Sequence, residues 1–321
     1  MQSPPKPRPT LLLSMEEDTL HIPHPAATVP LVAEADRPRL AALADQALRQ
    51  GLTHFRQGRY PVALEQFHHA LSNYQQAADQ PNTAKVLMVL SSAYYRLADY
   101  LWAADYGRQC LLLAQKIQHQ PLQQQVLEHL GNSYRHLGNL QAALDHMGKS
   151  LQLAKELHDS QAEMRALNNL AMIYRVKGLN RQAATLYEAS WLMAKTLGDT
   201  TVQLQVLQNL GNTYHTLHHY AQAIECYEKF LQLNEATPTA VASHQTTRRI
   251  LTQLTRASLA IHDYSRAIIY LQRHLALACT LGDSKGATAL IDDLSQCYLA
   301  LNQVRAFQVP DPMISDSMVS V

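Results

Sequence analysis

The sequence predicts an all-α fold, a linear array of stacked helix pairs, and three observations support this expectation. First, the pattern around Leu130 and Tyr134 returns after 40 residues at Leu170 and Tyr174, and self-similarity at such a period indicates a repeat array. Second, Gly138 and Gly178 follow the first segments of two repeats, where a helix end favours glycine. Third, two ladders share the 40-residue spacing: Ala63, Ala103, Ala143, Ala183 and Ala223, and Tyr94, Tyr134, Tyr174 and Tyr214.

Each repeat has the pattern of a helix pair. Leu167, Leu170 and Tyr174 stand at i, i+3 and i+7, which places them on one helix face. A small residue beside the middle leucine, such as Gly131, lets a second helix approach closely, and Ala143 provides the other half of that contact. Because one such pair cannot bury its apolar face alone, neighbouring pairs must stack.

The domain organisation follows the repeat. Residues 1–36 form an arm that is rich in proline and lacks a sustained period, so we expect it to be disordered. Residues 37–303 form the predicted solenoid, and residues 304–321 a disordered tail. The repeats are expected at about 40–80, 81–121, 122–161, 162–201, 202–236 and 247–283, and a capping helix at 285–301 covers the last apolar face.

The first two repeats differ from the best-kept pattern in defined ways. Repeat one contains Gly51, Gly58 and Tyr60 before its second-helix signature. Repeat two has Ser91 in place of the glycine and Gly107 where a large apolar residue is expected. Repeats three to five keep the pattern best.

Repeat six follows a shift in register. The alanine ladder steps from Ala223 to Ala267, which is 44 residues, and Pro238 lies within this step. A proline there breaks the helix and indicates a longer joint. Repeat six also has Thr255 and Ser258 in place of the glycine and tyrosine. The capping helix returns to the 40-residue spacing.

Composition restricts the function. The chain has 321 residues, a net charge of +1 and four cysteines, so it lacks the basic footprint of a nucleic-acid-binding protein. Its apolar stretches are too short for membrane insertion, and we expect a cytoplasmic protein. His215, His218 and His219 do not provide a tetrahedral ligand set and are interpreted as surface residues, so no metal is expected. Without a nucleotide loop or catalytic motif, neither enzymatic activity nor a cofactor is predicted.

The repeat resembles that of the tetratricopeptide repeat (TPR) family. Ala63, Phe67 and Ala70 match its second-helix signature in full, and the Leu-Gly-x-x-Tyr pattern matches its first helix. The usual period is 34 residues, so the helices here are longer. The longer repeat and the sequence Asn-Leu-Gly-Asn at 209–212 resemble the subclass found in G-protein-signalling modulators and bacterial scaffold proteins. The resemblance implies a right-handed α-solenoid of about six helix-turn-helix repeats.

The resemblance also implies that the first helices line a concave groove. The groove residues that it implies are Lys85, Arg96, Asn132, Arg135, Arg165, Asn168, Asn169, Arg175, Gln208, Asn209, Asn212, Arg249 and Arg256. Basic residues outnumber acidic ones along this row, which favours an extended or helical segment that carries Asp or Glu. The other interpretation is that these are ordinary solvated charges. Chaperone tails are disfavoured, because Glu128 stands where the family's carboxylate-binding members have a lysine.

The function expected from these features is that of a non-enzymatic scaffold or adaptor in an assembly or signalling complex. One rival is an autoinhibited regulator whose own arm, with Glu16, Glu17 and Asp18, occupies the groove. Another is an RNA-binding helical repeat, which requires a recurring pair of base-reading side chains, and no such pair is visible. The sequence leaves the partner and the oligomeric state open.

Overall fold

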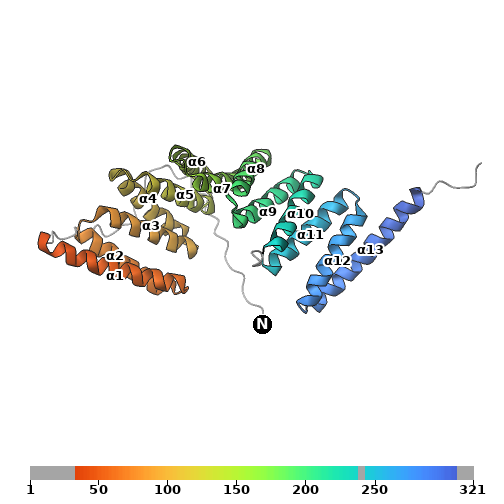
Figure 1. The fold of residues 1–321 in the computed structure, drawn as a ribbon, viewed down its shortest axis with the longest axis horizontal. Helices are drawn as coiled ribbons and strands as arrows, with labels where there is room; N and C mark the ends of the chain where they lie inside the picture. The colour runs from red at the N-terminus through yellow and green to blue at the C-terminus, as the bar shows by residue number, and fades with distance from the viewer. Residues whose placement is uncertain (1–32, 238–242, 309–321) are drawn as a thin grey trace, which may run out of the picture.

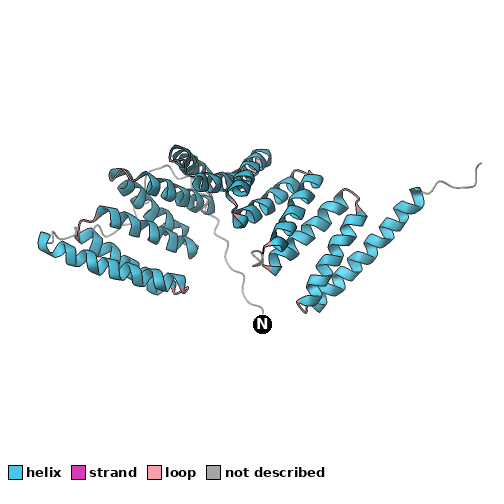
Figure 2. Cartoon of the chain, in the orientation of Figure 1, coloured by secondary structure: helices cyan, strands magenta, loops and turns pink. Residues whose placement is uncertain are grey.

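The structure is a computed structural model that describes residues 33–237 and 243–308. In these residues the chain is helical throughout, with short loops between the helices (Figure 2). A 3-10 turn, Glu34–Asp36, precedes thirteen α-helices: α1 Arg37–Arg56, α2 Tyr60–Gln76, α3 Gln80–Arg96, α4 Tyr100–Lys116, α5 Gln120–His136, α6 Leu140–Glu156, α7 Ser160–Val176, α8 Asn180–Leu197, α9 Thr200–Thr216, α10 Tyr220–Ala236, α11 His244–Ala260, α12 Tyr264–Thr280 and α13 Ser284–Gln308. This confirms the predicted all-α class.

The helices form consecutive antiparallel pairs, and the pairs are arranged in an arch with α1 at one end and α13 at the other (Figure 1). Each helix packs mainly against the helices before and after it in the chain. Such a one-dimensional array is the predicted repeat architecture.

The odd-numbered helices lie on the inner side of the arch. In direct contact between repeats, α3 touches α5, α5 touches α7 and α7 touches α9, whereas no two even-numbered helices of the described chain are in comparable contact. The helices that crowd together must be on the side towards which the array curves. Figure 1 agrees, since α6 and α8 lie on the outer edge of the arch and α5 and α7 beneath them.

Side-chain caps and left-handed residues set the helix ends. The carboxylates of Asp79, Asp159 and Asp199 each accept a hydrogen bond from a first-turn backbone N–H, at 3.1, 2.9 and 3.0 Å. Before many of these caps the chain turns through a residue with positive φ. Gly178 provides it at φ 78°, as predicted for a helix end, but His158 adopts the same conformation at φ 53°.

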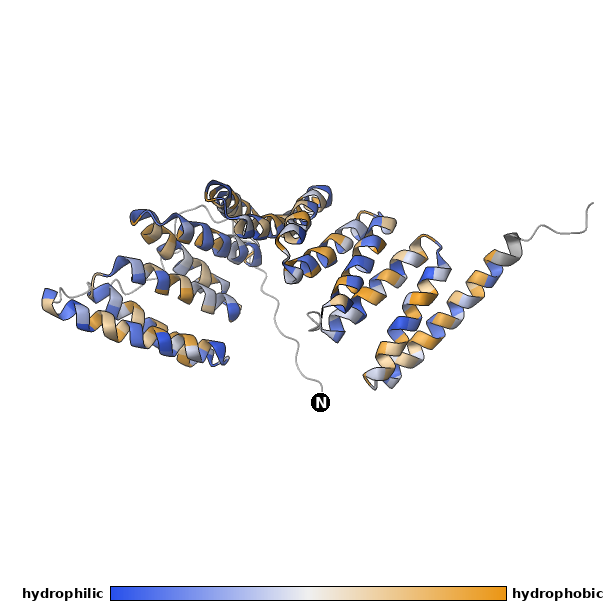
Figure 3. Ribbon diagram, viewed as in Figure 1, coloured by the Kyte–Doolittle hydropathy of each residue, from blue (hydrophilic) through white to orange (hydrophobic). Residues whose placement is uncertain are grey.

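The core consists of the seams between helices. All five residues of the alanine ladder are fully buried. A Cβ added at Gly131 would lie 2.8 Å from Met147 Cε, and one at Gly211 would lie 2.5 Å from the Tyr227 ring, so these glycines do permit close helix approach. Figure 3 shows apolar and polar residues alternating along every helix, as amphipathic packing requires.

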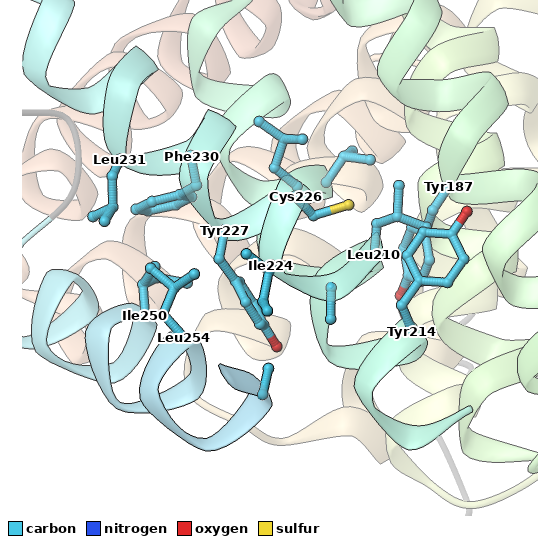
Figure 4. Packing of buried hydrophobic residues seen from close by; sticks show 14 of the residues in the cluster. Tyr187, Leu210, Tyr214, Ile224, Cys226, Tyr227, Phe230, Leu231, Ile250 and Leu254 are labelled. Carbon is cyan, nitrogen blue, oxygen red and sulfur yellow. The ribbon is translucent and has the colours of Figure 1, made fainter. Parts of the chain in front are cut away.

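The core is best seen where repeat five meets repeat six. There, Phe230 and Leu231 of α10 face Ile250 and Leu254 of α11 (Figure 4), and all four side chains are buried. The packing therefore continues from one repeat into the next across the register shift. Residues 238–242 of the joint itself lie outside the described residues.

The outer limits of the predicted solenoid differ slightly from the observed helices. α13 runs to Gln308, seven residues beyond the expected end of the capping helix at 301. Residues 1–32 and 309–321, which include most of the predicted arm and tail, lie outside the described residues. None of the described helices has the length and apolarity required to cross a membrane.

Candidate binding surface on the inner face

A buried carboxylate joins repeats three and four on the inner face. Glu128 of α5 accepts a hydrogen bond from Asn169 Nδ2 of α7 at 3.0 Å, and Arg165 Nε lies 3.6 Å from its other oxygen. Burial raises the pKa of Glu128, and Arg165 and Asn169 oppose that shift. Two predicted groove residues, Arg165 and Asn169, are therefore already engaged with the protein's own carboxylate.

The next step along the inner face has polar atoms without partners. The Tyr187 side chain of α8 is fully buried, and its hydroxyl has no hydrogen-bond partner with acceptable geometry. Burial raises its pKa, while the guanidinium groups of Arg175 and Arg135 lie close enough to oppose that shift. Arg135 Nε is also buried without a partner. Two cations thus lie beside a hydroxyl that can accept a poorly aligned hydrogen bond from Arg175 but has no acceptor for its own proton.

Comparison with the following repeat explains why the Tyr187 hydroxyl has no acceptor. The equivalent residue 40 positions later is Tyr227, whose hydroxyl donates to Asn212 Oδ1 at 2.8 Å. The residue 40 positions before Asn212 is Met172, and a thioether is only a weak acceptor. The tyrosine hydroxyl at this repeat position therefore has an acceptor in repeat five and none in repeat four.

Asn168 extends this group along α7. It is 5% exposed, and its Oδ1 has no hydrogen-bond partner. It lies seven residues before Arg175, which is about two helical turns along the same face. Together, Arg135, Asn168, Arg175 and Tyr187 are called the central polar site. Because buried polar groups are seldom left unpaired, an unpaired group requires an explanation, and an external ligand provides one.

An aromatic cluster orients Arg135 within this site. Arg135 Nη2 lies 2.8 Å from His136 Nε2, which is also 3.1 Å from the Tyr95 hydroxyl. The His136 ring stacks on Tyr100, with centroids 4.2 Å apart. Since His136 is held by two aromatic neighbours, it restricts the position of the guanidinium. This pre-organisation lowers the entropy lost when Arg135 binds a ligand.

The other predicted groove residues are dispersed. Lys85 donates to Asn82 at 3.2 Å, and the Arg96 guanidinium lies 5.9 Å from the centre of the Phe55 ring. Asn212 accepts from Tyr227, as described above. The remaining ones are half-buried or exposed: Asn132, Gln208, Asn209, Arg249 and Arg256. The structure therefore brings Arg135 and Arg175 together but spreads most of the row along the array.

Sequence reasoning missed Tyr187 and misjudged the surroundings of Glu128. A signal for Tyr187 was present, because repeats one and three have Phe67 and Met147 at its position and the partner position holds Met172. No comparable signal existed for Glu128, since its pairing depends on how two repeats are offset. No group of three or more His, Cys, Asp or Glu side chains within the described part of the chain is placed to hold a metal ion.

Stacked antiparallel helix pairs, with every first helix on the inner side, define an α-helical repeat protein. The chain belongs to the tetratricopeptide repeat family: the family profile matches residues 43–116, 122–191 and 163–236, which together exceed half of the chain. Among curated proteins, no significant sequence match is found.

Solved structures share the fold at low identity. A signal-transduction ATPase with a TPR sensor from Pyrococcus horikoshii is 15% identical, with a TM-score of 0.65 over 86% of this chain and 45% of that one. A Rap protein complexed with competence and sporulation factor is 15% identical, with a TM-score of 0.55 over 80% and 75%. A kinesin light chain TPR-like structure from Podosopora anserina is 16% identical, with a TM-score of 0.53 over 62% and 96%.

Proposed function

We propose that this protein is a non-enzymatic adaptor whose central polar site binds an acidic segment of a partner protein. TPR domains are typically protein–protein interaction modules. The proposal rests on the Tyr187 hydroxyl beside Arg135 and Arg175, because no group of the described chain accepts its proton. A carboxylate of Asp or Glu accepts hydrogen bonds from a hydroxyl and from guanidinium groups. It would satisfy donors that the chain itself leaves unpaired.

Asn168 favours a peptide over a free anion. Its unpartnered Oδ1 accepts a hydrogen bond, which a bare anion does not offer and a backbone N–H does. A peptide that places its side-chain carboxylate between Arg135 and Arg175 brings backbone donors along the same face of α7. Near the ion pair of Glu128 and Arg165, a further acidic side chain of the peptide is disfavoured, because the Glu128 carboxylate repels it.

The experiment compares two tyrosines. Binding of a fluorescent peptide of about ten residues, rich in Asp and Glu, is measured by anisotropy with Tyr187→Phe and Tyr227→Phe. Losing a charge-assisted hydrogen bond should weaken binding by roughly tenfold in Tyr187→Phe. Its folding should be unchanged or slightly more stable, because an unsatisfied buried hydroxyl is removed.

Tyr227→Phe is the matched control. It removes a hydroxyl that is bonded within the protein, so it should lower the free energy of unfolding by about 1 kcal/mol and leave affinity unchanged. Equal affinity of wild type and Tyr187→Phe for the acidic peptide would remove the central polar site from the proposal.

Three further properties concern the localisation of the protein, its subclass and the role of its N-terminal arm. A cytoplasmic signalling role and membership of the G-protein-signalling-modulator-like subclass stay predictions. So does occupation of the groove by the arm, since residues 16–18 lie outside the described residues. If the arm competes, deleting residues 1–35 should raise affinity for the acidic peptide, and unchanged affinity would exclude this regulation.

A further inference from the structure

A second concavity opens at the far end of the array, between α11, α12 and α13. It has a volume of about 540 Å³, within the range of small-molecule sites. Its walls include Arg256 and Leu259 of α11, Leu271 and His274 of α12, and Leu290 and Asp293 of α13. These residues define what we call the C-terminal pocket. Most of its lining is apolar, with a few polar groups around it.

At one packing position that lines the pocket, repeat six has a smaller side chain than repeats four and five. Leu271 takes the place held by Tyr187 in repeat four and Tyr227 in repeat five, allowing for the register shift of four residues. Those tyrosines pack at the contact between the helices of a pair and are fully buried. Leucine fills less of this space. Leu271 itself lines the C-terminal pocket.

His274 lines the pocket and has a buried polar atom without a partner. It is 9% exposed, and its Nε2 has no hydrogen-bond partner. Repeats three and four have Ser150 and Ser190 at this position, and each serine donates to a backbone carbonyl of the preceding helix. The imidazole of repeat six makes no such bond through Nε2. A ligand group can satisfy it.

Two opposite charges line the pocket from different helices. Arg256 lies on the α11 wall and Asp293 on the α13 wall, and both residues are exposed. Within the described residues neither forms an ion pair or a side-chain hydrogen bond. A ligand that carries one positive and one negative group close together would complement both walls.

We propose that the C-terminal pocket binds a free amino acid with a large apolar side chain. The carboxylate lies on Arg256 and His274 Nε2, the ammonium group on Asp293, and the side chain on Leu259 and Leu271. A peptide C-terminus is a poorer fit, because it would place a carboxylate near Asp293 without the ammonium group that compensates for it. This inference does not rest on the proposed function, since the two sites share no residue.

The first test uses the full chain and calorimetry. Free leucine, phenylalanine and tryptophan are titrated alongside their N-acetyl amides, which keep the side chain but lack both charges. At least one free amino acid should bind with a Kd of about 1 mM or tighter, and its amide at least about tenfold more weakly. No binding of any free amino acid up to about 10 mM, or equal binding of the amide, would overturn the proposal.

The second test assigns the binding to this pocket. Arg256→Gln and Asp293→Asn should each weaken amino-acid binding by at least about tenfold, while Asp292→Asn, an exposed neighbour outside the pocket lining, should not. Leu271→Tyr restores the residue of repeats four and five and should abolish binding by filling the cavity, with a thermal melt to confirm folding. Unchanged affinity in Arg256→Gln and Asp293→Asn would contradict the assignment even if an amino acid binds elsewhere.

Discussion

At the scale of single residues, the tyrosines at one repeat position, Tyr187 and Tyr227, differ in whether their hydroxyl groups have an acceptor. Tyr187 and Tyr227 are both fully buried and both fill the contact between the helices of a pair. Only their neighbours differ, since Asn212 accepts the hydroxyl of Tyr227 while Met172 stands in the equivalent place for Tyr187. The repeat thus provides the packing, and departures from the repeat provide groups that are available to a ligand.

Glycine substitutions test the close helix contacts. Gly211→Ala should lower the free energy of unfolding by about 1 to 3 kcal/mol, because the new Cβ would lie 2.5 to 2.9 Å from atoms of the Tyr227 ring. Gly148→Ala is the control, since nothing lies within 4 Å of its Cβ position in α6. It should raise stability by about 0.5 to 1 kcal/mol through helix propensity. Urea denaturation measures both, and equal effects would contradict the role given to Gly211.

The sequence predicted these packing residues but only part of the candidate site. Spacing alone identifies the alanine ladder and the close glycines, because packing repeats with the helix pairs. Spacing does not reveal that Arg165 and Asn169 engage Glu128, since such pairing depends on the offset between neighbouring helices and on side-chain conformations. Nor does it show that Arg135 and Arg175 meet at Tyr187, which belongs to a second helix.

At the scale of elements, each helix pair closes through a left-handed residue. Glycine provides it at some turns, but Ala78, Ala98, Gln118, His158, His218 and His262 adopt the same conformation at others, at φ between 53° and 59°. The 40-residue period imposes this geometry even where the residue disfavours it. The turn could be placed from the sequence, whereas its conformation at the non-glycine positions could not be predicted from residue type.

Turn exchanges test this interpretation. His158→Gly should stabilise the protein by about 0.5 to 1 kcal/mol, and Gly178→Ala should destabilise it by a similar amount, because only the backbone preference changes. Nothing lies within 4 Å of the Cβ position at Gly178, so no clash contributes. Thermal melts check both variants. A loss of stability in His158→Gly would show that the imidazole contributes more than the strained backbone costs.

The last helix also shows a limit of pattern reading. α13 continues to Gln308, although the repeat pattern predicts an end at 301. The next proline in the chain is Pro310, so nothing before it breaks the helix. The repeat marks where a paired helix would turn, and within the described residues no further helix follows α13.

At the scale of the whole molecule, histidines distributed along the array couple stability to pH. Burial lowers the pKa values of His129, His136, His146, His215 and His274. The pKa of His129 falls to about 4, so between the unfolded value near 6.5 and this value the unfolded chain binds a proton that the folded chain does not. The free energy of unfolding should therefore fall as the pH decreases through this window.

His129 contributes roughly 3 kcal/mol to this loss below pH 4, of which about 2 kcal/mol falls between neutral pH and pH 5. Glu128 acts in the opposite direction near its own, raised pKa, because the folded state protonates first. Urea denaturation at neutral pH and near pH 5 measures the difference. His129→Gln should reduce the pH dependence, whereas His218→Gln, an exposed control, should not. If the free energy of unfolding changes with pH equally in wild type and His129→Gln, His129 is not held neutral by burial.

The array also determines how a ligand is held. Because each repeat contacts only its neighbours, a ligand that touches α5, α7 and α8 joins two repeats that otherwise meet only through their shared seam. The central polar site lies at this seam, near the middle of the arch (Figure 1). Binding there should raise the stability of the central repeats more than that of the ends, which hydrogen exchange can resolve.

The most direct measurement of the central claim is a charge-exchange titration. Wild type and the double variant Arg135→Glu with Arg175→Glu are each titrated with the acidic peptide and with a matched peptide in which Lys replaces every Asp and Glu. The account predicts that the double variant loses affinity for the acidic peptide by at least about a hundredfold and gains affinity for the basic one. If the folded double variant still binds the acidic peptide as tightly as wild type does, the peptide does not bind at the inner face.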